Sequence, residues 1–292
     1  MAEQASEVAF APGPVAQQPG YQQQDTKGQQ QTQYGTKGQP GPPLPPGFQP
    51  QQVEVQTVPA IPPIPGCPPG LEYLTQLDQV LMRQLIEIVE LFTGWEMNNK
   101  YTINNTMGQQ IFYVKEDTDC MERQCCGPNR GFTMNVTDNM GREVMRIVRD
   151  FKCFAGPACS CCKSCDSCRY DMQVEAPPGE VIGYVKQGQY FLASIFTVMD
   201  AQRHPVFTMK GPTCPIQTVC CTEDINFHVT TIDGNQEIGV LRKQWAGVLR
   251  EMISDADKFG VSFPVDLDVK LKATLIGLMF MIDFCFFERK QK

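Results

Sequence analysis

The sequence FGVSFPVDLDVKLKATLIGLMFMIDFCFF, residues 259–287, joins two different hydrophobic patterns and largely decides the fold. From Phe259 to Leu271 the odd positions are apolar and the even positions mostly polar, which is the period of a β-strand with one polar face. Residues 273–287 are apolar on all sides, which is typical of a helix surrounded by protein or lipid. We therefore expect a strand that leads directly into a buried C-terminal helix.

Two environments can surround this helix. The segment 273–287 rises about 22 Å at about 1.5 Å per residue, less than the roughly 30 Å of a hydrocarbon core. Asp283 within it would cost on the order of 2–3 kcal/mol at a bilayer centre. Length and charge thus favour a helix enclosed by a β-barrel, and a membrane span is the alternative.

An ordered internal repeat lies upstream of this segment. Its members recur 94 or 95 positions later in the chain: Tyr101 and Phe196, Ile111 and Val206, Cys120 and Cys214, Cys125 and Cys220, Phe132 and Phe227, Asp138 and Asp233, Glu143 and Glu237. Two copies of a several-stranded unit can close into one antiparallel sheet, which removes exposed edges. Turn sequences at residues 138–141 and 233–235 support hairpins. The matched cysteines, including Cys125 and Cys126, are expected to be small buried residues.

Two further regions precede the repeat. Residues 1–69 hold 15 of the 23 prolines and 15 glutamines, so a disordered tail is predicted there and one folded domain over residues 70–292. In the tail, Pro42–Pro46 contains PxxP spacings that could dock an SH3-type partner, although a plain linker has the same composition. Leu77, Leu81 and Leu85 recur at helical spacing, which predicts a helix over residues 75–92.

Six of the 14 cysteines lie between Cys153 and Cys168, in the segment that joins the two repeats. No cleavable apolar leader opens the chain, so we expect reduced thiols rather than a disulfide framework. The spacing of Cys162, Cys165 and Cys168 suits a zinc site, but a structural zinc site usually has two separated ligand pairs. Adjacent thiols next to basic residues suit multiple S-acylation. Acylation, a metal site and unmodified thiols remain as alternatives.

Several motifs together resemble the phospholipid scramblases, and the resemblance covers residues 70–288. They are Leu71–Leu74, Asn98–Tyr101, Cys125–Pro128, Asp138–Glu143, Ala176–Gly179, Ile182–Tyr184, Trp245–Glu251, Asp255–Gly260 and Asp266–Val269. The resemblance implies a twelve-stranded closed antiparallel barrel around a hydrophobic C-terminal helix (residues 273–287), as in tubby-like domains. It also implies calcium-activated, ATP-independent, bidirectional movement of phospholipids between leaflets, at the cytosolic face of the plasma membrane.

The family's acylation motif, Cys-Cys-x-x-Cys-Cys, implies the lipidation sites in the cysteine-rich segment. Cys161, Cys162 and Cys165 match the motif, but Asp166 stands at the place of its last cysteine. The resemblance therefore implies palmitate-type acylation at these three residues. Substitute sites are Cys159 and Cys168.

The family's calcium segment matches residues 255–266. The residues at the ligand positions of an EF-hand-like loop are Asp255, Asp257, Phe259, Val261, Phe263 and Asp266. Neither phenylalanine supplies a side-chain oxygen, and the alternation of apolar residues also fits a buried strand preceded by two loop aspartates. We expect either a weak calcium site or such a strand.

No catalytic constellation is recognisable, so we expect no enzyme. The first hypothesis is a calcium-activated scramblase that acts on the phospholipid membrane, with assembly into a homo-oligomer as one route to transport. The alternative is an acyl-anchored adapter that binds partners through the tail and the barrel surface. The net charge of −7 speaks against nucleic acid as a partner. Residues 239–248 resemble the family's nuclear import segment, but Val240 replaces a basic residue, which puts nuclear import in doubt.

Overall fold

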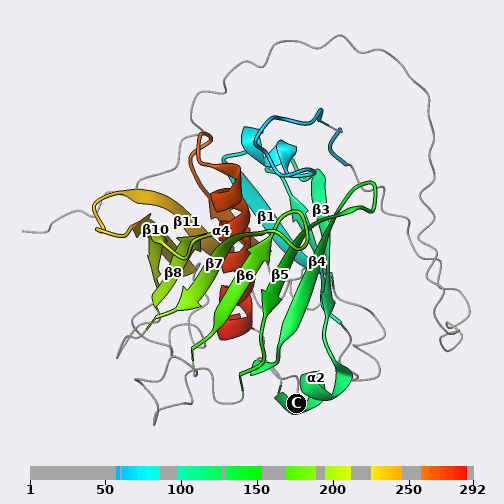
Figure 1. Cartoon of the computed structure of the whole chain (residues 1–292), viewed down its shortest axis with the longest axis vertical. Coiled ribbons are helices and arrows are strands. Elements are labelled where there is room, and N and C mark those ends of the chain that lie inside the picture. Colours follow the sequence, from blue (N-terminus) through cyan, green and yellow to red (C-terminus); the bar gives the residue numbers. More distant parts are fainter. Residues whose placement is uncertain are drawn as a thin grey trace, which may run out of the picture. The chain divides into compact units, whose positions relative to one another are not determined.

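The protein forms a closed β-barrel that surrounds one helix (Figure 1). The computed structural model describes residues 57–59, 61–85, 98–126, 129–152, 169–188, 195–211, 225–244 and 258–287. The elements are η1 (Glu72–Gln76), β1 (Gln79–Leu85), β2 (Lys100–Asn104), β3 (Gln110–Asp117), α2 (Cys120–Cys126), β4 (Phe132–Asp138), β5 (Glu143–Arg149), β6 (Asp171–Glu175), β7 (Val181–Gln187), β8 (Ile195–Asp200), β9 (Pro205–Lys210), β10 (Ile225–Thr231), β11 (Glu237–Gln244), β12 (Lys258–Ser262), α4 (Val269–Ile282) and the π-helical segment η4 (Asp283–Phe287).

Each strand pairs antiparallel with its sequence neighbour, and β12 closes the sheet by pairing with β1. This confirms the predicted closed antiparallel barrel of twelve strands around a C-terminal helix. The repeated residues lie at equivalent places, because β2 to β5 carry the first copy and β8 to β11 carry the second. The two copies are therefore related by a step of six strands around the barrel.

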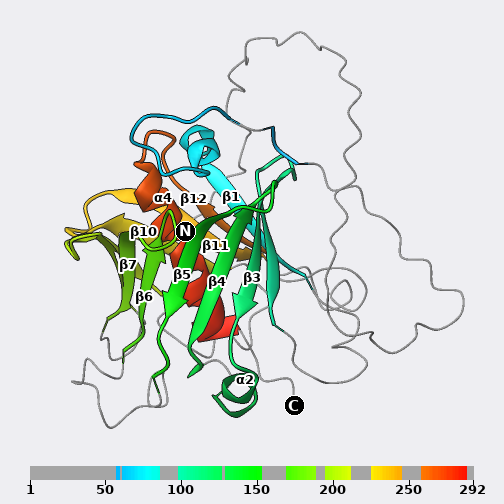
Figure 2. The ribbon, with the colours of Figure 1, turned by 45° about the vertical axis from the view of Figure 1, so that its right-hand side comes forward.

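The barrel has two different ends. Short turns connect β2 to β3, β4 to β5, β6 to β7, β8 to β9 and β10 to β11 at one end, which we call the hairpin rim. At the turns predicted from sequence, Gly141 and Gly234 have φ values of +77° and +73°, a backbone conformation that glycine adopts without strain. The opposite end, which we call the α2 rim, contains α2 and the C-terminal end of α4 (Figures 1 and 2).

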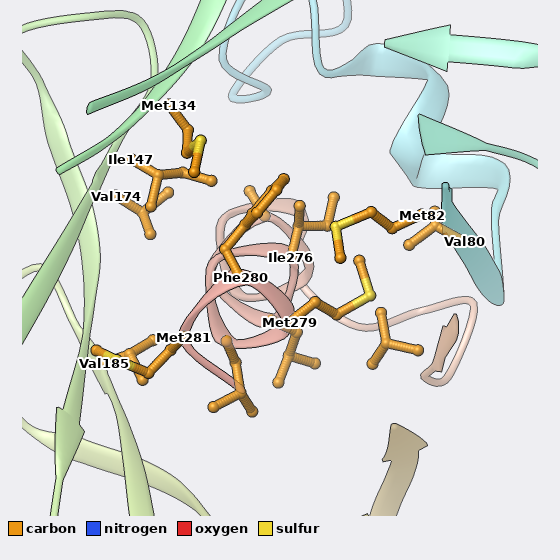
Figure 3. Close-up of a cluster of buried hydrophobic side chains, with 14 of the residues drawn as sticks. Val80, Met82, Met134, Ile147, Val174, Val185, Ile276, Met279, Phe280 and Met281 are labelled. Carbon is orange, nitrogen blue, oxygen red and sulfur yellow. The ribbon is translucent and has the colours of Figure 1, made fainter. Parts of the chain in front are cut away.

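Helix α4 fills the barrel. Asp268 caps its N-terminus, because the side chain accepts hydrogen bonds from the backbone N–H groups of Lys270 and Leu271 at 2.9 and 3.3 Å. Every residue from Lys272 to Ile282 is buried. Figure 3 shows the helix side chains inside a ring of strand side chains: Ile276, Met279, Phe280 and Met281 are surrounded by Val80, Met82, Met134, Ile147, Val174 and Val185. The structure thus places the helix within the barrel rather than across a bilayer.

Among the described residues, no helix combines the length and the hydrophobicity that crossing a membrane requires.

Two secondary-structure predictions are wrong. The predicted helix over residues 75–92 is replaced by the short 3₁₀ helix η1 and by β1, while residues 86–92 lie outside the described part. A spacing of four residues is also a multiple of two, so Leu81 and Leu85 share the outer face of a strand whose buried residues are Val80 and Met82.

The strand predicted from Phe259 to Leu271 is likewise shorter. It ends at Ser262, the chain turns after Pro264, and α4 begins at Val269. Proline lacks the N–H that would continue the sheet, and the Asp268 cap starts the helix four residues earlier than predicted.

The prediction that the matched cysteines are buried is also wrong for the pair that the structure describes. Cys125 is exposed and Cys126 is partly buried. They lie on α2, in a connection between β3 and β4, and a connection runs over the surface rather than through the core. Cys120 has no described side chain, and Cys214, Cys220 and Cys221 lie outside the described residues.

The barrel contacts extend to the N-terminal side of residue 70. Thr57 forms a parallel bridge with Gln110, and the Val58 N–H donates to the Gln110 carbonyl at 3.2 Å. Leu71 and Leu74 are completely buried in the core. Residues 1–56, with the proline-rich Pro42–Pro46 segment, lie outside the described part.

The contact between β7 and α4 depends on a missing side chain, which gives the first prediction. A Cβ atom at Gly183 would lie 2.3 Å from Thr274 Oγ1 and 2.9 Å from the Met199 carbonyl oxygen. Because both contacts are too short, Gly183→Ala should lower the free energy of unfolding by about 1–3 kcal/mol in urea denaturation. Thr274→Ala removes one of the two clashes, so the double variant should recover part of the loss. If the stability losses of the two single variants simply added up in the double variant, residues 183 and 274 would not be in contact.

Candidate functional site

The two ends of the cysteine-rich segment meet at the α2 rim. Residues 153–168 connect β5 to β6, and the cysteines implied as acylation sites (Cys159, Cys161, Cys162, Cys165 and Cys168) lie outside the described residues. The Lys152 ammonium donates a hydrogen bond to the Arg169 carbonyl oxygen at 2.6 Å. The chain therefore leaves and re-enters the barrel at one place, and the acylation sites stay a prediction.

Helix α2 lies beside this place. The Tyr170 hydroxyl donates to Asn129 Oδ1, and the Gly131 N–H donates to Glu122 of α2 at 3.2 Å. Two large apolar side chains of the same rim are in contact with solvent: Met121 on α2 is 71% exposed and Phe151 after β5 is 42% exposed. Apolar side chains are exposed at the hairpin rim as well, where Met107 is 69% and Met140 is 70% exposed, so such exposure does not by itself distinguish the α2 rim.

A buried ion pair lies in the wall just inside this rim. Arg130 Nε donates to Glu116 Oε1 at 2.7 Å and its Nη2 to Oε2 at 3.0 Å, while the two side chains are only 2% and 0% exposed. Burial by itself raises the pKa of the Glu116 carboxyl, but the hydrogen bonds and charge of Arg130 outweigh it. With further hydrogen bonds from Thr118 and the Asn99 backbone, the pKa lies below its ordinary value of 4.5.

At the α2 rim, cationic side chains and aromatic rings of the barrel surround η4. The Arg149 guanidinium lies 4.3 Å from the ring centroid of Phe132, 4.6 Å from that of Tyr170 and 5.2 Å from that of Phe284. Arg130 lies 4.8 Å from the Phe284 ring. Such contacts are attractive and strengthen in a desolvated site.

Lys243 and Tyr101 hold the remainder of η4. The Lys243 ammonium lies 3.9 Å from the centroid of Phe287, and the Tyr101 hydroxyl donates to Asp283 at 3.2 Å. Asp283, which looked costly in a bilayer, is thus hydrogen-bonded inside protein. Lys243 belongs to the segment that resembles a nuclear import sequence, and its side chain is buried, with only 2% exposed. Residues 245–248 of that segment lie outside the described part.

The opposite end of α4 is held by one buried lysine. Lys272 Nζ donates to the carbonyl oxygens of Leu74, Leu77 and Val265 at 2.9, 2.7 and 2.7 Å, so its three protons are all used. Burial lowers the pKa of Lys272, although the charges of nearby aspartates oppose this shift. The lysine ties α4 to η1 and to the chain after β12.

The structure describes four of the six residues implied for calcium, and these four do not lie in one loop. Phe259 and Val261 are buried on β12, Phe263 is buried just after it, and Asp266 is exposed in the following turn. Since β12 is extended and pairs with both β1 and β11, residues 258–262 do not form an EF-hand-like loop. Asp255 and Asp257 lie outside the described residues. Within the part of the chain that the structure describes, no cluster of three or more His, Cys, Asp or Glu could hold a metal ion.

The buried charges were missed from sequence, although a signal was present. On β3 the inward positions are Phe112, Val114 and Glu116, so a carboxylate stands where the alternation demands an apolar residue. A charge at such a position predicts a buried partner, because an isolated buried charge is very costly. The position of the partner, Arg130, depends on the β3–β4 connection and could not be read from the pattern.

Comparison with known proteins gives a consistent family match. The family model described as "Scramblase" matches residues 58–289. Phospholipid scramblase 1 of Rattus norvegicus is 48% identical over 76% of this chain and 64% of its own length. Phospholipid scramblase 2 of Bos taurus and phospholipid scramblase 1 of Homo sapiens are each 47% identical over 76% of this chain. The matched regions make up 72% of the bovine protein and 67% of the human protein. The matched region is thus slightly less than two thirds of the rat protein.

The buried ion pair gives the second prediction. Glu116→Gln leaves Arg130 buried without a carboxylate, so it should lower the free energy of unfolding at pH 7 by about 3–5 kcal/mol. Because the pKa of Glu116 is lowered by folding, its contribution is complete above pH 4.5 and is lost as the pH falls through the folded pKa. The difference between variant and parent in urea unfolding should therefore shrink in acid.

The matched control is the pair of Glu143 with Arg146. Its shortest N–O distance is 2.8 Å, but the side chains of Glu143 and Arg146 are 31% and 36% exposed. Glu143→Gln should cost less than about 1 kcal/mol. Equal losses for Glu116→Gln and Glu143→Gln would show that burial of the first pair has no energetic consequence.

Proposed function

The chain belongs to the phospholipid scramblase family, and on this basis we propose that it moves phospholipids between the two leaflets of a membrane. The observation that carries the proposal is the family match over residues 58–289, which includes the whole barrel and α4. Exchange between leaflets makes and breaks no covalent bond. The protein would instead lower the barrier for a polar headgroup to cross hydrocarbon.

The finer features of the activity are part of the proposal. Calcium activation, independence from ATP and movement in both directions are supported by the sequence resemblance. For calcium we propose Asp255 and Asp257 as the principal ligands, because they precede the α2-rim end of β12. Asp266 follows the other end of that extended strand.

The filled interior bears on the route of the lipid. Helix α4 occupies the barrel with buried side chains from Lys272 to Ile282, and removal of the helix would expose all of them to water. It would also break the Lys272 hydrogen bonds and the contacts of η4. We therefore propose that lipids pass outside the barrel, in an assembly of several copies, rather than through its centre.

Attachment to the cytosolic face of the plasma membrane is proposed to occur through acyl chains. The implied sites are Cys161, Cys162 and Cys165, with Cys159 and Cys168 as substitutes. The hydrogen bond between Lys152 and Arg169 keeps the two ends of the cysteine-rich segment together at the α2 rim, so acyl chains on this segment would bring that end of the barrel to the membrane. Several chains are needed, since one chain gives only marginal, reversible binding.

The filled barrel also favours a second candidate function. A barrel without an internal path suits an acyl-anchored adapter that recruits partners through its surface and through the Pro42–Pro46 segment. Deletion of residues 1–56 separates the two functions, because it leaves the described barrel complete. Lipid transport should survive this deletion, whereas recruitment of SH3-type partners should be lost.

The third prediction concerns transport and calcium. Purified protein in liposomes should accelerate the exchange of a fluorescent phospholipid between leaflets when calcium is added. Asp255→Ala combined with Asp257→Ala removes two carboxylates and should raise the calcium concentration for half-maximal exchange about tenfold or more. Asp266→Ala is the control and should respond like the parent. If Asp266→Ala were as defective as the other variant, all three aspartates would belong to one calcium-binding loop. If the parent exchanged lipid no faster than protein-free vesicles do, the proposed transport would be refuted.

The fourth prediction concerns the acyl anchor. Replacement of Cys161, Cys162 and Cys165 by alanine should move the protein from the membrane fraction to the soluble fraction of expressing cells, because the chains provide most of the attachment. Hydroxylamine, which cleaves thioesters, should release the parent in the same way. Cys125→Ala removes an exposed thiol at the same rim and should change nothing. Stoichiometric zinc in the purified protein would contradict free, acylatable thiols.

A further inference from the structure

Two turns at the hairpin rim hold a methionine in solvent in the same way. In the β2–β3 turn, Asn105 Oδ1 accepts a hydrogen bond from the Met107 backbone N–H at 3.0 Å. In the β4–β5 turn, Asp138 Oδ1 accepts one from the Met140 N–H at 2.9 Å. Met107 is 69% exposed and Met140 is 70% exposed. Because these side-chain hydrogen bonds fix the backbone of each turn, both methionines project from defined positions.

One glutamine joins the two turns to the N-terminal segment. The Gln110 carbonyl oxygen accepts hydrogen bonds from the Val58 N–H at 3.2 Å and from the Asn139 side-chain amide at 2.9 Å. The Gln110 side-chain amide donates to Asn139 Oδ1 at 3.2 Å. Figure 1 shows the N-terminal segment, in blue, at the same end of the barrel as the β4–β5 turn. We call the surface that these three parts form the hairpin corner, and its residues are 57–61, 105–110 and 138–142.

A pocket opens at this corner, between the N-terminal segment and the β4–β5 turn. Its volume is about 110 Å³. The apolar residues that line it include Val58, Pro59, Ile61, Tyr73, Ile111 and Met140. An apolar cavity of about 150 Å³ can hold a benzene ring, so this pocket has room for one side chain of the size of methionine. Met107 projects from the neighbouring turn.

The exposed charges of the corner balance each other. Its three segments contain one acidic and one basic residue, Asp138 and Arg142. Their side chains form an ion pair at 2.7 Å, in which Arg142 is 68% exposed. Glu72 in the pocket wall is buried and accepts a hydrogen bond from the Gly70 N–H at 2.8 Å. Two copies of a chain with a net charge of −7 repel each other overall, so a surface with balanced charges is where they approach at the lowest electrostatic cost.

We propose that the hairpin corner is a contact between two copies of this chain. A two-fold interface brings the same patch of both copies together, so the patch must be complementary to itself. The corner meets this condition, because a projecting methionine and a pocket that fits it lie side by side. Met107 of each copy enters the pocket of the other, and the flexible thioether side chain adapts to the shape of the pocket.

A bilayer is a poorer occupant of the corner. Insertion of the turns into the interface would bury Met107 and Met140, but it would give the pocket no partner. The corner also lies at the rim opposite to the cysteine-rich connection, so it stays accessible when acyl chains hold the α2 rim at a membrane. The inference deepens the proposed assembly of several copies, and it rests on the proposed function only for the purpose of that assembly.

The test measures self-association of the full, unacylated chain purified from a bacterial host. A reductant is present throughout, because the chain has 14 cysteines that could otherwise link copies by disulfides. Sedimentation velocity from about 1 to 300 µM gives the dissociation constant of the dimer. For one small interface we expect a value on the order of 10 µM.

Two variants each remove one half of the contact. Met107→Ser removes the projecting side chain, and Ile61→Lys places a longer, charged side chain in the pocket. Each change acts twice in a symmetric dimer, so each should weaken association about 100-fold. Met107→Leu keeps an apolar side chain of similar volume and should stay within about threefold of the parent. The matched control is Met121→Ser, which removes a methionine that is 71% exposed at the α2 rim and should change nothing.

A mixture of the two weakened variants tests the two-fold geometry. The Met107→Ser copy keeps an open pocket and the Ile61→Lys copy keeps its methionine, so one of the two contacts can still form between them. The mixture should therefore contain heterodimers about tenfold weaker than the parent dimer, although each variant alone stays monomeric. Circular dichroism checks that all variants fold like the parent.

Several results would overturn the inference. A parent that stays monomeric up to about 300 µM would exclude a second copy as the occupant. If that monomer bound phosphatidylcholine vesicles and Met107→Ser did not, the corner would be a membrane contact instead. Equal weakening by Met107→Ser and Met121→Ser would show unspecific apolar association, and a mixture without heterodimers would exclude the two-fold contact. Failure of lipid exchange in the transport assay with an intact dimer would refute the proposed function and leave this inference standing.

Discussion

The enclosure of α4 by the sheet is the constraint on which the rest of the structure depends. A closed sheet of twelve strands is too wide for its own side chains to fill, since about eight strands already give an interior just filled by side chains. A helix that is apolar on all sides, in turn, has no stable exposed state in water. Each element therefore removes the other's unfavourable surface. This mutual burial explains why glycine stands at positions 183 and 277, where a Cβ atom would lie too close to Thr274 of the helix and to Val174 of the sheet, respectively.

Buried polar groups give the helix its position along the barrel axis. Apolar packing alone is not directional, so a uniformly hydrophobic rod could slide within the sheet. Lys272 defines one end, because its three hydrogen bonds to backbone carbonyls exist in a single register. Asp283 and the ring of Phe284 define the other end through Tyr101 and the buried arginines. These groups act mainly as determinants of specificity, since buried charges contribute little net stability of their own.

Much of the architecture was predictable from hydrophobic periods and from the repeat, because both reflect burial directly. The predictions failed where two periods coincide, as at Leu81 and Leu85, or where one residue ends a pattern, as at Pro264 and Asp268. The candidate site was harder to predict from the sequence. The cations that hold η4 come from β5, β11 and the β3–β4 connection, and only the closed topology brings them together. Sequence alone contains no measure of such long-range proximity.

The two ends of the barrel differ in what they carry. The connection that contains the cysteine-rich segment lies at the α2 rim with the exposed Phe151 and Met121. The hairpin rim has short turns and exposed apolar side chains of its own, which are Met107, Met140, Ile232 and Val265. Exposed apolar residues therefore do not distinguish the two ends, whereas the position of the cysteine-rich connection does. Under the proposed function, acyl chains on that connection would bring the α2 rim to the bilayer, and the filled interior leaves the outer wall of the barrel as the surface past which lipids would move.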